Sequence, residues 1–242
     1  MPSIEKNREM WGKNANWEGK GEEWSRNWGG TPYIWAGTVL PRIIQFVPCE
    51  TIVEIAPGYG RFTQYLRKLC KRLIIVDLNK NCIDECKKRF CFDKKIIYLV
   101  NDGRTLKGIP DNSVDFIFSW DSLVHCEEDV IKSYLFESKR VLKFNGRGLF
   151  HHSNYGIFNM EFNKHCFSNS MTAEKFIIFC KEAGIFCNYQ EIIDQDKDMQ
   201  ACLSFFTKTD KYSKTKIFNN KEFYKEVNNL RRISESCNPA NY

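Results

Sequence analysis

Two of the four histidines stand side by side in the stretch RGLFHHSNYG, residues 147–156. An imidazole titrates near neutral pH, so His151 and His152 are candidates for general bases or metal ligands. Adjacent residues of a strand point to opposite faces of its sheet, so both can enter one site only if the strand ends between them. We expect one of the two to face a site, with a preference for His152, which shares its face with Asn154, and the other to pack.

A second reactive group follows the apolar run VDFIFS. Asp121 and His125 lie in the segment WDSLVHCEEDV, and no local structural rule requires either residue at its position. We expect both to be catalytic, together with His152 or His151. These four side chains could in principle converge as oxygen and nitrogen ligands of a metal, but strand alternation argues against that arrangement, and we expect no metal.

A glycine-bearing turn, VEIAPGYGRFTQYL, occupies residues 53–66 between a predicted strand and a predicted helix. Gly58 and Gly60 allow the backbone to approach a ligand closely, while the start of the helix offers unpaired amide donors. The dinucleotide fingerprint needs a third glycine, but Thr63 stands at that position. This departure weakens the case for a nicotinamide cofactor.

Acidic residues follow the next two predicted strands. Asp77 lies nineteen residues after Gly58, where a carboxylate can hold the hydroxyls of a ribose, and VNDGRTL places Asn101, Asp102 and Gly103 after the third strand. In an open α/β sheet the ligand crevice lies at the carboxyl ends of the strands. These residues are therefore expected to line one crevice.

The elements that must position these residues alternate between short apolar strands and amphipathic helices, which predicts an α/β fold with parallel strands and helices on both faces. Residues 31–46, 170–184 and 219–234 are predicted helices, and two later strands joined by QDKD form a predicted hairpin. The strands are predicted at 51–55, 73–76, 96–100, 114–119 and 148–152.

The chain resembles class I S-adenosylmethionine-dependent methyltransferases over residues 50 to about 207. Their acidic and glycine-containing first motif is matched by Glu54, Ala56, Gly58 and Gly60, although many members have glycine where Ala56 stands. The resemblance implies a Rossmann-like, seven-stranded, mostly parallel sheet with a C-terminal antiparallel hairpin. It further implies that Asp77 holds the ribose and that Asp102 accepts from the adenine amino group.

The resemblance implies S-adenosyl-L-methionine as the cofactor and a set of residues that contact it. The expected contacts are Glu54, Ala56, Pro57, Gly58, Tyr59, Gly60, Asp77, Leu78, Asn101, Asp102, Gly103, Ser119 and Trp120. The Asn/Asp-Pro-Pro-aromatic motif of enzymes that methylate nucleobase amino groups is absent, which argues against a nucleic-acid substrate. The pair DSLVH and HHSN resembles bacterial methyltransferases of small-molecule and surface-polysaccharide pathways.

The resemblance predicts methyl transfer to a small polar acceptor, an oxygen of a sugar-like or phosphate-bearing molecule such as a phosphoramidate precursor of a surface polysaccharide. Two rival interpretations are a nicotinamide-dependent reductase on the same fold and a non-catalytic module that binds nucleic acid or a partner. Neither the acceptor nor the oligomeric state follows from the sequence, and a homodimer is one option.

The 242 residues, 43% of them hydrophobic, predict a single domain with extensions. Residues 1–48 form a Trp-rich helical segment that either packs on the domain or covers a ligand pocket, 49–207 form the cofactor-binding core, and 208–242 form a basic helical tail with eight Lys and Arg against four Asp and Glu. Eleven scattered cysteines without metal-type spacing, and the lack of an apolar run of membrane-spanning length, predict a cytoplasmic protein without a membrane partner.

Overall fold

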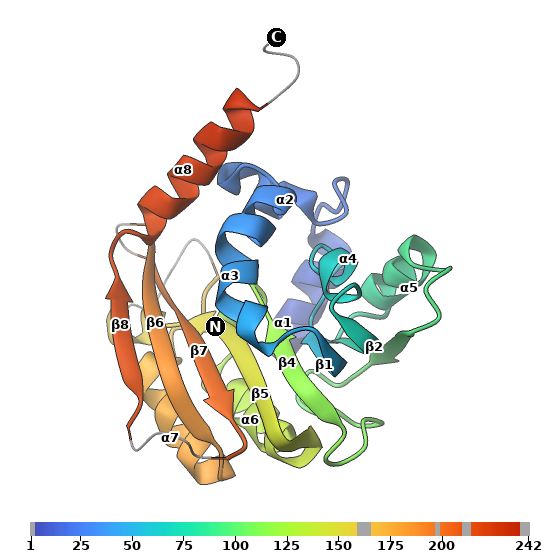
Figure 1. Ribbon diagram of the computed structural model, residues 1–242, viewed down its shortest axis with the longest axis vertical. Coiled ribbons are helices and arrows are strands. Elements are labelled where there is room, and N and C mark those ends of the chain that lie inside the picture. The colour runs from blue at the N-terminus through green and yellow to red at the C-terminus, as the bar shows by residue number, and fades with distance from the viewer. Residues whose placement is uncertain (1–2, 159–165, 197–198, 210–213, 238–242) are drawn as a thin grey trace.

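The structure is a computed structural model that describes residues 3–158, 166–196, 199–209 and 214–237. An eight-stranded sheet with the order β3-β2-β1-β4-β5-β7-β6-β8 runs through it (Figure 1). Its strands are β1 Cys49–Ile55, β2 Cys70–Asp77, β3 Ile96–Val100, β4 Val114–Ser119, β5 Leu142–Ser153, β6 Phe186–Asp196, β7 Met199–Thr207 and β8 Lys216–Asn220. Within this sheet β7 is antiparallel to both neighbours, and the other pairs are parallel.

The predicted alternation of strands and helices is confirmed, and so is the hairpin of β6 and β7; its predicted turn includes residues 197 and 198, which lie outside the described residues. The prediction of seven strands was wrong. Residues 216–220, expected in a helical tail, form β8 and extend the sheet beside β6. Isoleucine and phenylalanine in KIFNN favour a strand, and the hydroxyl of Thr215 donates to the carbonyl of Cys187 at 2.7 Å, which ties this segment to β6.

Helices cover both faces of the sheet, as expected for parallel strands. One face carries α2 Thr31–Ile34, α3 Leu40–Ile43, α4 Thr63–Leu66, α5 Lys80–Arg89 and α8 Phe223–Ser236, and the other carries α6 Glu128–Val141 and α7 Ala173–Ala183. Successive residues alternate between the two layers, so that Ile52 belongs to the first hydrophobic cluster and Val53 to the second.

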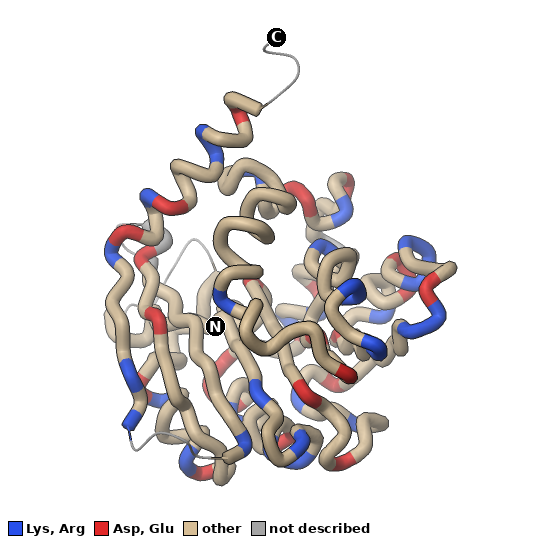
Figure 2. The backbone as a smooth tube through the Cα atoms, in the orientation of Figure 1, with Lys and Arg blue, Asp and Glu red and all other residues tan. Residues whose placement is uncertain are grey.

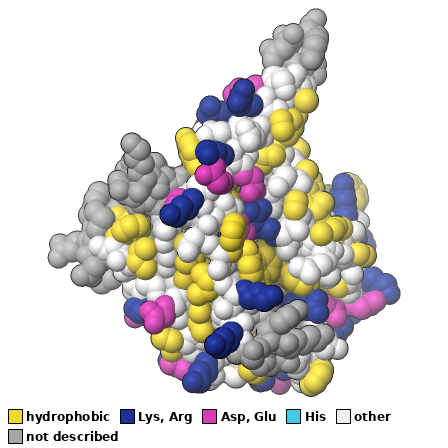
Figure 3. Space-filling view, turned by 60° about the vertical axis from the view of Figure 1, so that its left-hand side comes forward, with side chains coloured by type: hydrophobic (Ala, Val, Ile, Leu, Met, Phe, Trp, Pro, Cys, Tyr) yellow, Lys and Arg dark blue, Asp and Glu magenta, His cyan; other side chains and the backbone are white. Residues whose placement is uncertain are grey.

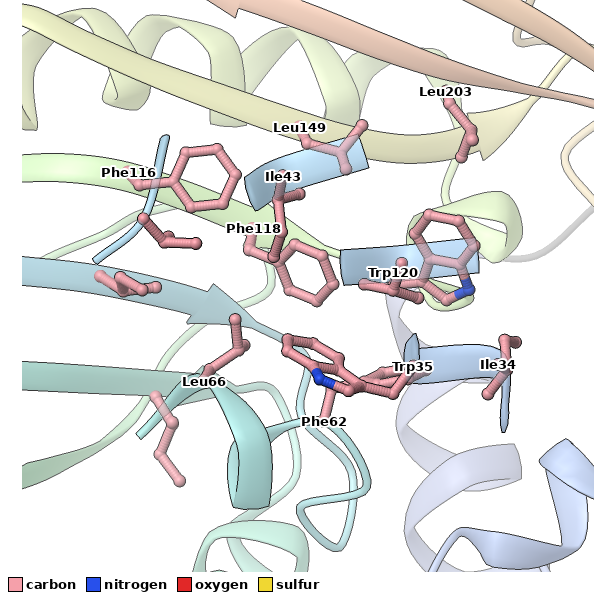
Figure 4. Packing of buried hydrophobic residues seen from close by; sticks show 14 of the residues in the cluster. Ile34, Trp35, Ile43, Phe62, Leu66, Phe116, Phe118, Trp120, Leu149 and Leu203 are labelled. Carbon is pink, nitrogen blue, oxygen red and sulfur yellow. The ribbon is translucent and has the colours of Figure 1, made fainter. Parts of the chain in front are cut away.

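Aromatic rings fill the first layer next to the carboxyl ends of the central strands. Phe62 lies 6.2 Å from both Trp35 and Phe118, and Phe118 stacks on Trp120 at 6.5 Å between ring centroids (Figure 4). These rings come from the helical segment before β1, from the glycine turn and from β4. The layer therefore fixes the turn and the end of β4 relative to each other.

Residues 3–30, called the arm below, contain α1 Ile4–Glu9, a π-helical turn at Met10–Asn14 and a 3-10 helix at Glu22–Trp28. The predicted helix at 31–46 is confirmed as one helical path through α2, a π-helical turn and α3. At the other end of the chain, α8 contacts β6, α2 and the 3-10 helix of the arm, above the carboxyl end of β6 (Figure 1). The arm and α8 thus meet at the same edge of the sheet.

The tail predicted as basic carries charges of both signs along α8 (Figure 2). Ion pairs link Lys225 to Glu222 and Arg231 to Glu235 on this helix. The face that includes β8 and α8 shows hydrophobic side chains among these charges (Figure 3). None of the described helices is both long and apolar enough to cross a membrane.

Candidate active site

A cavity of about 810 Å³ lies at the carboxyl edge of the sheet. The glycine turn after β1, the end of β2 and the loop after β4 form its inner wall, and the arm and α8 form its outer wall. The strand order reverses direction between β1 and β4, and ligands of open α/β sheets bind at such a switch point. The cavity therefore lies at the carboxyl ends of the strands, where the sequence predicts the ligand crevice.

The glycine turn has three residues in the left-handed region, Ala56 with φ 56°, Gly58 with φ 57° and Gly60 with φ 85°. Ala56 thus adopts the strained conformation that favours glycine. Gly58 lines the cavity, and a Cβ there would lie 2.8 Å from the ring of Trp17. A Cβ on Gly60 would instead lie 2.5 Å from Phe90, so Gly60 serves packing against α5.

Two buried carboxylates stand behind the turn and line the cavity. Glu54 accepts a 2.6 Å hydrogen bond from the hydroxyl of Thr63, and burial raises the pKa of Glu54 to about 7. Asp77 accepts from the amides of Asn79 at 2.8 Å and Gly58 at 3.2 Å, while burial raises its pKa to about 6. Neither carboxylate has an ion-pair partner among the described residues, so a cationic ligand would stabilise their charged forms.

The turn after β3 differs from its prediction. Gly103 lines the cavity, but Asp102 is exposed, and its carboxylate accepts from the amides of Arg104 and Thr105 at 2.8 and 2.7 Å. These bonds lower the pKa of Asp102 against the opposing effect of burial. The amide group of Asn101 bonds to Thr105, Gly103 and the Tyr134 hydroxyl. Both side chains therefore shape the turn, and neither lines the cavity.

The end of β4 brings Trp120 and Asp121 to the cavity, whereas Ser119 is buried and donates to the carbonyl of Ile55 at 3.0 Å. Asp121 has φ 62°, in the left-handed region that aspartate enters more readily than most residues. Its carboxylate forms a 2.9 Å ion pair with Arg61, whose guanidinium also donates to the hydroxyl of Ser25 in the arm at 3.1 Å. Arg61 thus joins the arm, the glycine turn and the end of β4.

His125 lines the cavity next to Trp11, with 4.8 Å between the ring centroids. Its Nδ1 lies 3.0 Å from the carbonyl of Cys166. A carbonyl can only accept, so Nδ1 carries the proton and Nε2 keeps a lone pair. Burial lowers the pKa of His125, which keeps the ring neutral at pH 7. A neutral imidazole of this tautomer can accept a proton or a hydrogen bond.

The two adjacent histidines point to opposite faces of β5, as strand alternation requires, but the preference for His152 was wrong. His151 lies on the cavity side, where its Nδ1 accepts from the amide of Asp121 at 3.1 Å and its ring is 5.1 Å from Trp120. His152 stacks on Phe176 of α7 at 4.6 Å, on the far face of the sheet. Phe150, two residues before His152, belongs to the layer under α7, so parity places His152 there as well.

The contacts of His152 are those of a structural residue. Its Nδ1 donates to the Ser153 carbonyl at 2.8 Å and its Nε2 accepts from the hydroxyl of Ser204 at 2.7 Å. Burial lowers the pKa of His152 to about 3 and that of His151 to about 4, so both rings are neutral. Asn154 is on the α7 side with His152, and its side chain accepts from the amide of Ala173 at 2.6 Å.

Of the predicted site residues, ten line the cavity: Glu54, Ala56, Pro57, Gly58, Asp77, Leu78, Gly103, Trp120, Asp121 and His125. The other predicted residues lie outside it: Tyr59, Gly60, Asn101, Asp102, Ser119, His151 and His152. No three His, Cys, Asp or Glu side chains in the described part of the chain are grouped as a metal site would require.

The cavity is also lined by residues that the sequence did not single out: Arg61 of the glycine turn, and Asn27, Phe167, Asp194, Phe223, Tyr224, Val227, Asn228 and Arg231. Phe223, Val227 and Arg231 are spaced by four, so they share a face of α8, and this periodicity could have marked the helix as a wall. Asp194 and Asn27 carry no such signal. Trp28, the residue after Asn27, also lines the cavity, and its ring centroid is 5.5 Å from that of Phe223.

The donor set fits S-adenosylmethionine. The glycine turn lines the cavity at Gly58, two carboxylates can face the ribose and the cationic groups, and the nearby guanidinium of Arg61 is already paired with Asp121. A dinucleotide would instead bring its pyrophosphate to this carboxylate-rich end, where like charges repel.

Residues 53–150 match the family described as "Methyltransferase domain". A curated relative, ribosomal RNA small subunit methyltransferase A of Coxiella burnetii, is 27% identical over 119 residues, which are 42% of this chain and 46% of that protein. The protein of the same name from Leptothrix cholodnii is 36% identical over 63 residues, 25% of this chain and 23% of its own length. The chain thus spans less than half the length of the curated relatives it matches.

Solved structures share the fold. A putative type 11 methyltransferase from Sulfolobus solfataricus has a TM-score of 0.51 and 23% identity, covering 72% of this chain and 93% of that one. The putative methyltransferase in complex with the Haloferax volcanii Trm112 methyltransferase activator has a TM-score of 0.59 and 17% identity, covering 80% and 95%. Residues 53–150 are therefore similar to a methyltransferase domain, and the chain shares the fold of solved methyltransferases.

Proposed function

We propose that this chain transfers a methyl group from S-adenosylmethionine to a small polar acceptor. The observation that carries the proposal is that a single cavity has two chemically different ends. The end at Gly58 and Asp77 suits the cofactor, whereas the other end is lined by aromatic rings such as Trp28 and Phe223 and by polar side chains, among them Asn228, Asp194 and Arg231. Trp120 and Asp121 lie on the wall between them, at the end of β4.

When bound, S-adenosylmethionine supplies an electrophilic methyl group on a positively charged sulfur. The protein then has to align the acceptor with that methyl, exclude water and take up a proton if the acceptor is a hydroxyl. Neutral His125 with its lone pair at Nε2 is the proposed proton acceptor, and Asp121, fixed by Arg61, is proposed to orient the acceptor. His151 acts on the site through the backbone of Asp121.

For an oxygen acceptor we propose a sugar-like or phosphate-bearing molecule, a precursor of a surface polysaccharide. Aromatic rings give such a molecule flat apolar surfaces, and Asn27, Asn228 and Arg231 offer donors for hydroxyl or phosphate oxygens. We further propose that the protein acts in the cytoplasm, a location supported by eleven cysteines that are all free thiols.

RNA is the second candidate acceptor, because the curated relatives are ribosomal RNA methyltransferases. Two features of this chain favour a small molecule instead. The sequence after β4 is SWDS, without the Asn/Asp-Pro-Pro-aromatic motif, and the arm and α8 wall the far end of the cavity.

Calorimetry with S-adenosylhomocysteine tests the cofactor, and transfer of a labelled methyl group tests the acceptor class. We expect binding of S-adenosylhomocysteine, and methylation of sugar phosphates or nucleotide sugars but not of ribosomal RNA. Methylation of ribosomal RNA alone would assign the second candidate. A folded protein that binds NAD(P)H and not S-adenosylhomocysteine would be a reductase.

A further inference from the structure

The first half of the arm crosses the cofactor end of the cavity from one side to the other. Near the turn after β3, a Cβ on Gly103 would lie 3.4 Å from Ile4. Further along, the side chain of Asn81 on α5 donates to the carbonyl of Gly12 at 2.7 Å. At the glycine turn, Trp17 stacks on Tyr59 at 4.5 Å. The arm therefore follows the ends of β3, β2 and β1 in turn.

The arm covers the cavity without filling it. Ile4, Trp11 and Trp17 line the same cavity as Glu54 and Asp77, so a ligand-sized space remains between the arm and the sheet edge. Trp17 lies directly over Gly58, where the absence of a side chain lets the ring approach. A ligand in the cavity would lie beside the contact between Trp17 and Gly58, with the Trp17 ring as part of the wall that encloses it.

Polar contacts hold the arm in this position, two of them to the rest of the domain and one within the arm. The side-chain amide of Asn7 donates to the carbonyl of His125 at 2.7 Å, and the indole of Trp17 donates to the carbonyl of Trp11 at 2.9 Å. Beyond Trp17, Gln64 donates to Glu22 at 3.1 Å. Bonds that fix the arm to the domain on both sides of the cavity preorganise it as a wall, which lowers the cost of ordering it when a ligand binds.

We propose that residues 4–17 are part of the cofactor site, as an outer wall that holds S-adenosylmethionine against the sheet edge and slows its release. This inference rests on the proposed function, because it takes the ligand at Gly58 and Asp77 to be S-adenosylmethionine. The arm lies outside residues 53–150, so the matched domain is incomplete as a cofactor site without it. Trp17 is the main contact, and Ile4 and Trp11 complete the wall.

The test compares two tryptophans of the arm in the full-length chain, with S-adenosylhomocysteine as the probe. Trp17→Ala is expected to weaken its binding by about tenfold or more and to speed dissociation by a similar factor, since buried tryptophans often dominate a binding surface. Trp28→Ala, at the acceptor end, is expected to change the affinity by less than about twofold. Calorimetry gives the affinity and stopped-flow tryptophan fluorescence gives the rate.

A milder variant covers the case in which Trp17→Ala does not fold. Asn81→Ala removes the hydrogen bond to the arm at Gly12, and we expect the affinity to fall by about threefold, the usual effect of losing one hydrogen bond. If the wild type binds S-adenosylhomocysteine and both Trp17→Ala and Asn81→Ala bind it equally well, the arm is not part of the site. Equal losses in Trp17→Ala and Trp28→Ala would also overturn the inference, whereas absence of binding by the wild type would overturn the proposed function.

Discussion

The two ends of the cavity are built in different ways. The cofactor end is formed mainly by short loops that directly follow β1, β2 and β4, so neighbours in sequence are neighbours in space. The acceptor end combines Asn27, Asp194 and Arg231, which come from the arm, from β6 and from α8. The first end can be recognised from local sequence, whereas the second exists only once distant segments have packed together.

The largest effect is expected at the turn that defines the cofactor end. Gly58→Ala places a methyl group 2.8 Å from Trp17 at φ 57°, so it disturbs both the turn and the arm. We expect affinity for S-adenosylhomocysteine to fall by about a hundredfold, measured by calorimetry. Gly108→Ala is the matched control, because Gly108 also has a positive φ, at 90°, but the nearest atom to a Cβ there is Cδ1 of Leu99, at an ordinary contact distance of 4.0 Å. Equal affinities of the two variants would show that Gly58 does not face the ligand.

The next effect concerns the ion pair at the boundary between the two ends. Arg61→Met leaves the carboxylate of Asp121 without its partner, and we expect the free energy of unfolding to fall by about 3 kcal/mol in urea titrations. Adding Asp121→Asn removes the unpaired charge and should recover part of that loss. If the two losses simply add, Arg61 does not act through Asp121.

Changes in pH should affect the cofactor end of the cavity most, because Glu54 and Asp77 lie there. Burial raises the pKa of these groups to about 7 and about 6, above their ordinary values, so their contribution to the stability of the ligand-free fold is greatest at low pH and is lost as the pH rises through these values. We expect unfolding free energy to drop by about 2 kcal/mol between pH 5 and pH 8. Over the same range, affinity for cationic S-adenosylmethionine should rise. A Glu54→Gln variant that keeps the full pH dependence of both quantities would contradict this account.

The smallest effect on binding is expected at His152, on the far face of the sheet. His152→Phe leaves the buried hydroxyl of Ser204 without its acceptor, at a cost of about 2 kcal/mol in unfolding free energy. Affinity for S-adenosylhomocysteine should stay within about twofold of the wild type. His125→Ala should show the reverse pattern, with stability and cofactor binding retained and methyl transfer lost. Loss of cofactor binding in a folded His152→Phe variant would show that His152 contributes to the site.

Much of the fold could be predicted from the sequence, because the strands carry recognisable runs of apolar residues and the helices carry residues that mark where they begin and end. Thr172 caps α7 through a 3.1 Å bond from the amide of Lys175, and Gly184 ends it with φ 69°. The strand at 216–220 was missed because four of its five residues are exposed and show no alternation of buried and exposed positions, and only its pairing with β6 makes it a strand.

Site residues were predicted where their backbone position fixed their direction, and missed where it did not. Gly58 and Asp77 sit at strand ends that can face only the crevice. Asp102 follows a strand end too, but its carboxylate accepts hydrogen bonds from the backbone amides of Arg104 and Thr105. Such local bonds compete with binding to a ligand, and the sequence motif does not reveal them. Strand alternation predicted that His151 and His152 point to opposite faces of β5. It could not predict which face lies toward the cavity, because that depends on which face packs under α7.

The left-handed backbone of Asp121 restricts which residues this position can hold. With φ 62° the chain there accepts glycine, asparagine and aspartate with little strain, while a β-branched residue would be costly. Removing the charge with asparagine therefore changes the chemistry and leaves the shape intact. In a library of random substitutions at this position, the backbone conformation would exclude most residues before any catalytic requirement applies. Tolerance of Asn and intolerance of Val there would therefore report on folding rather than on mechanism.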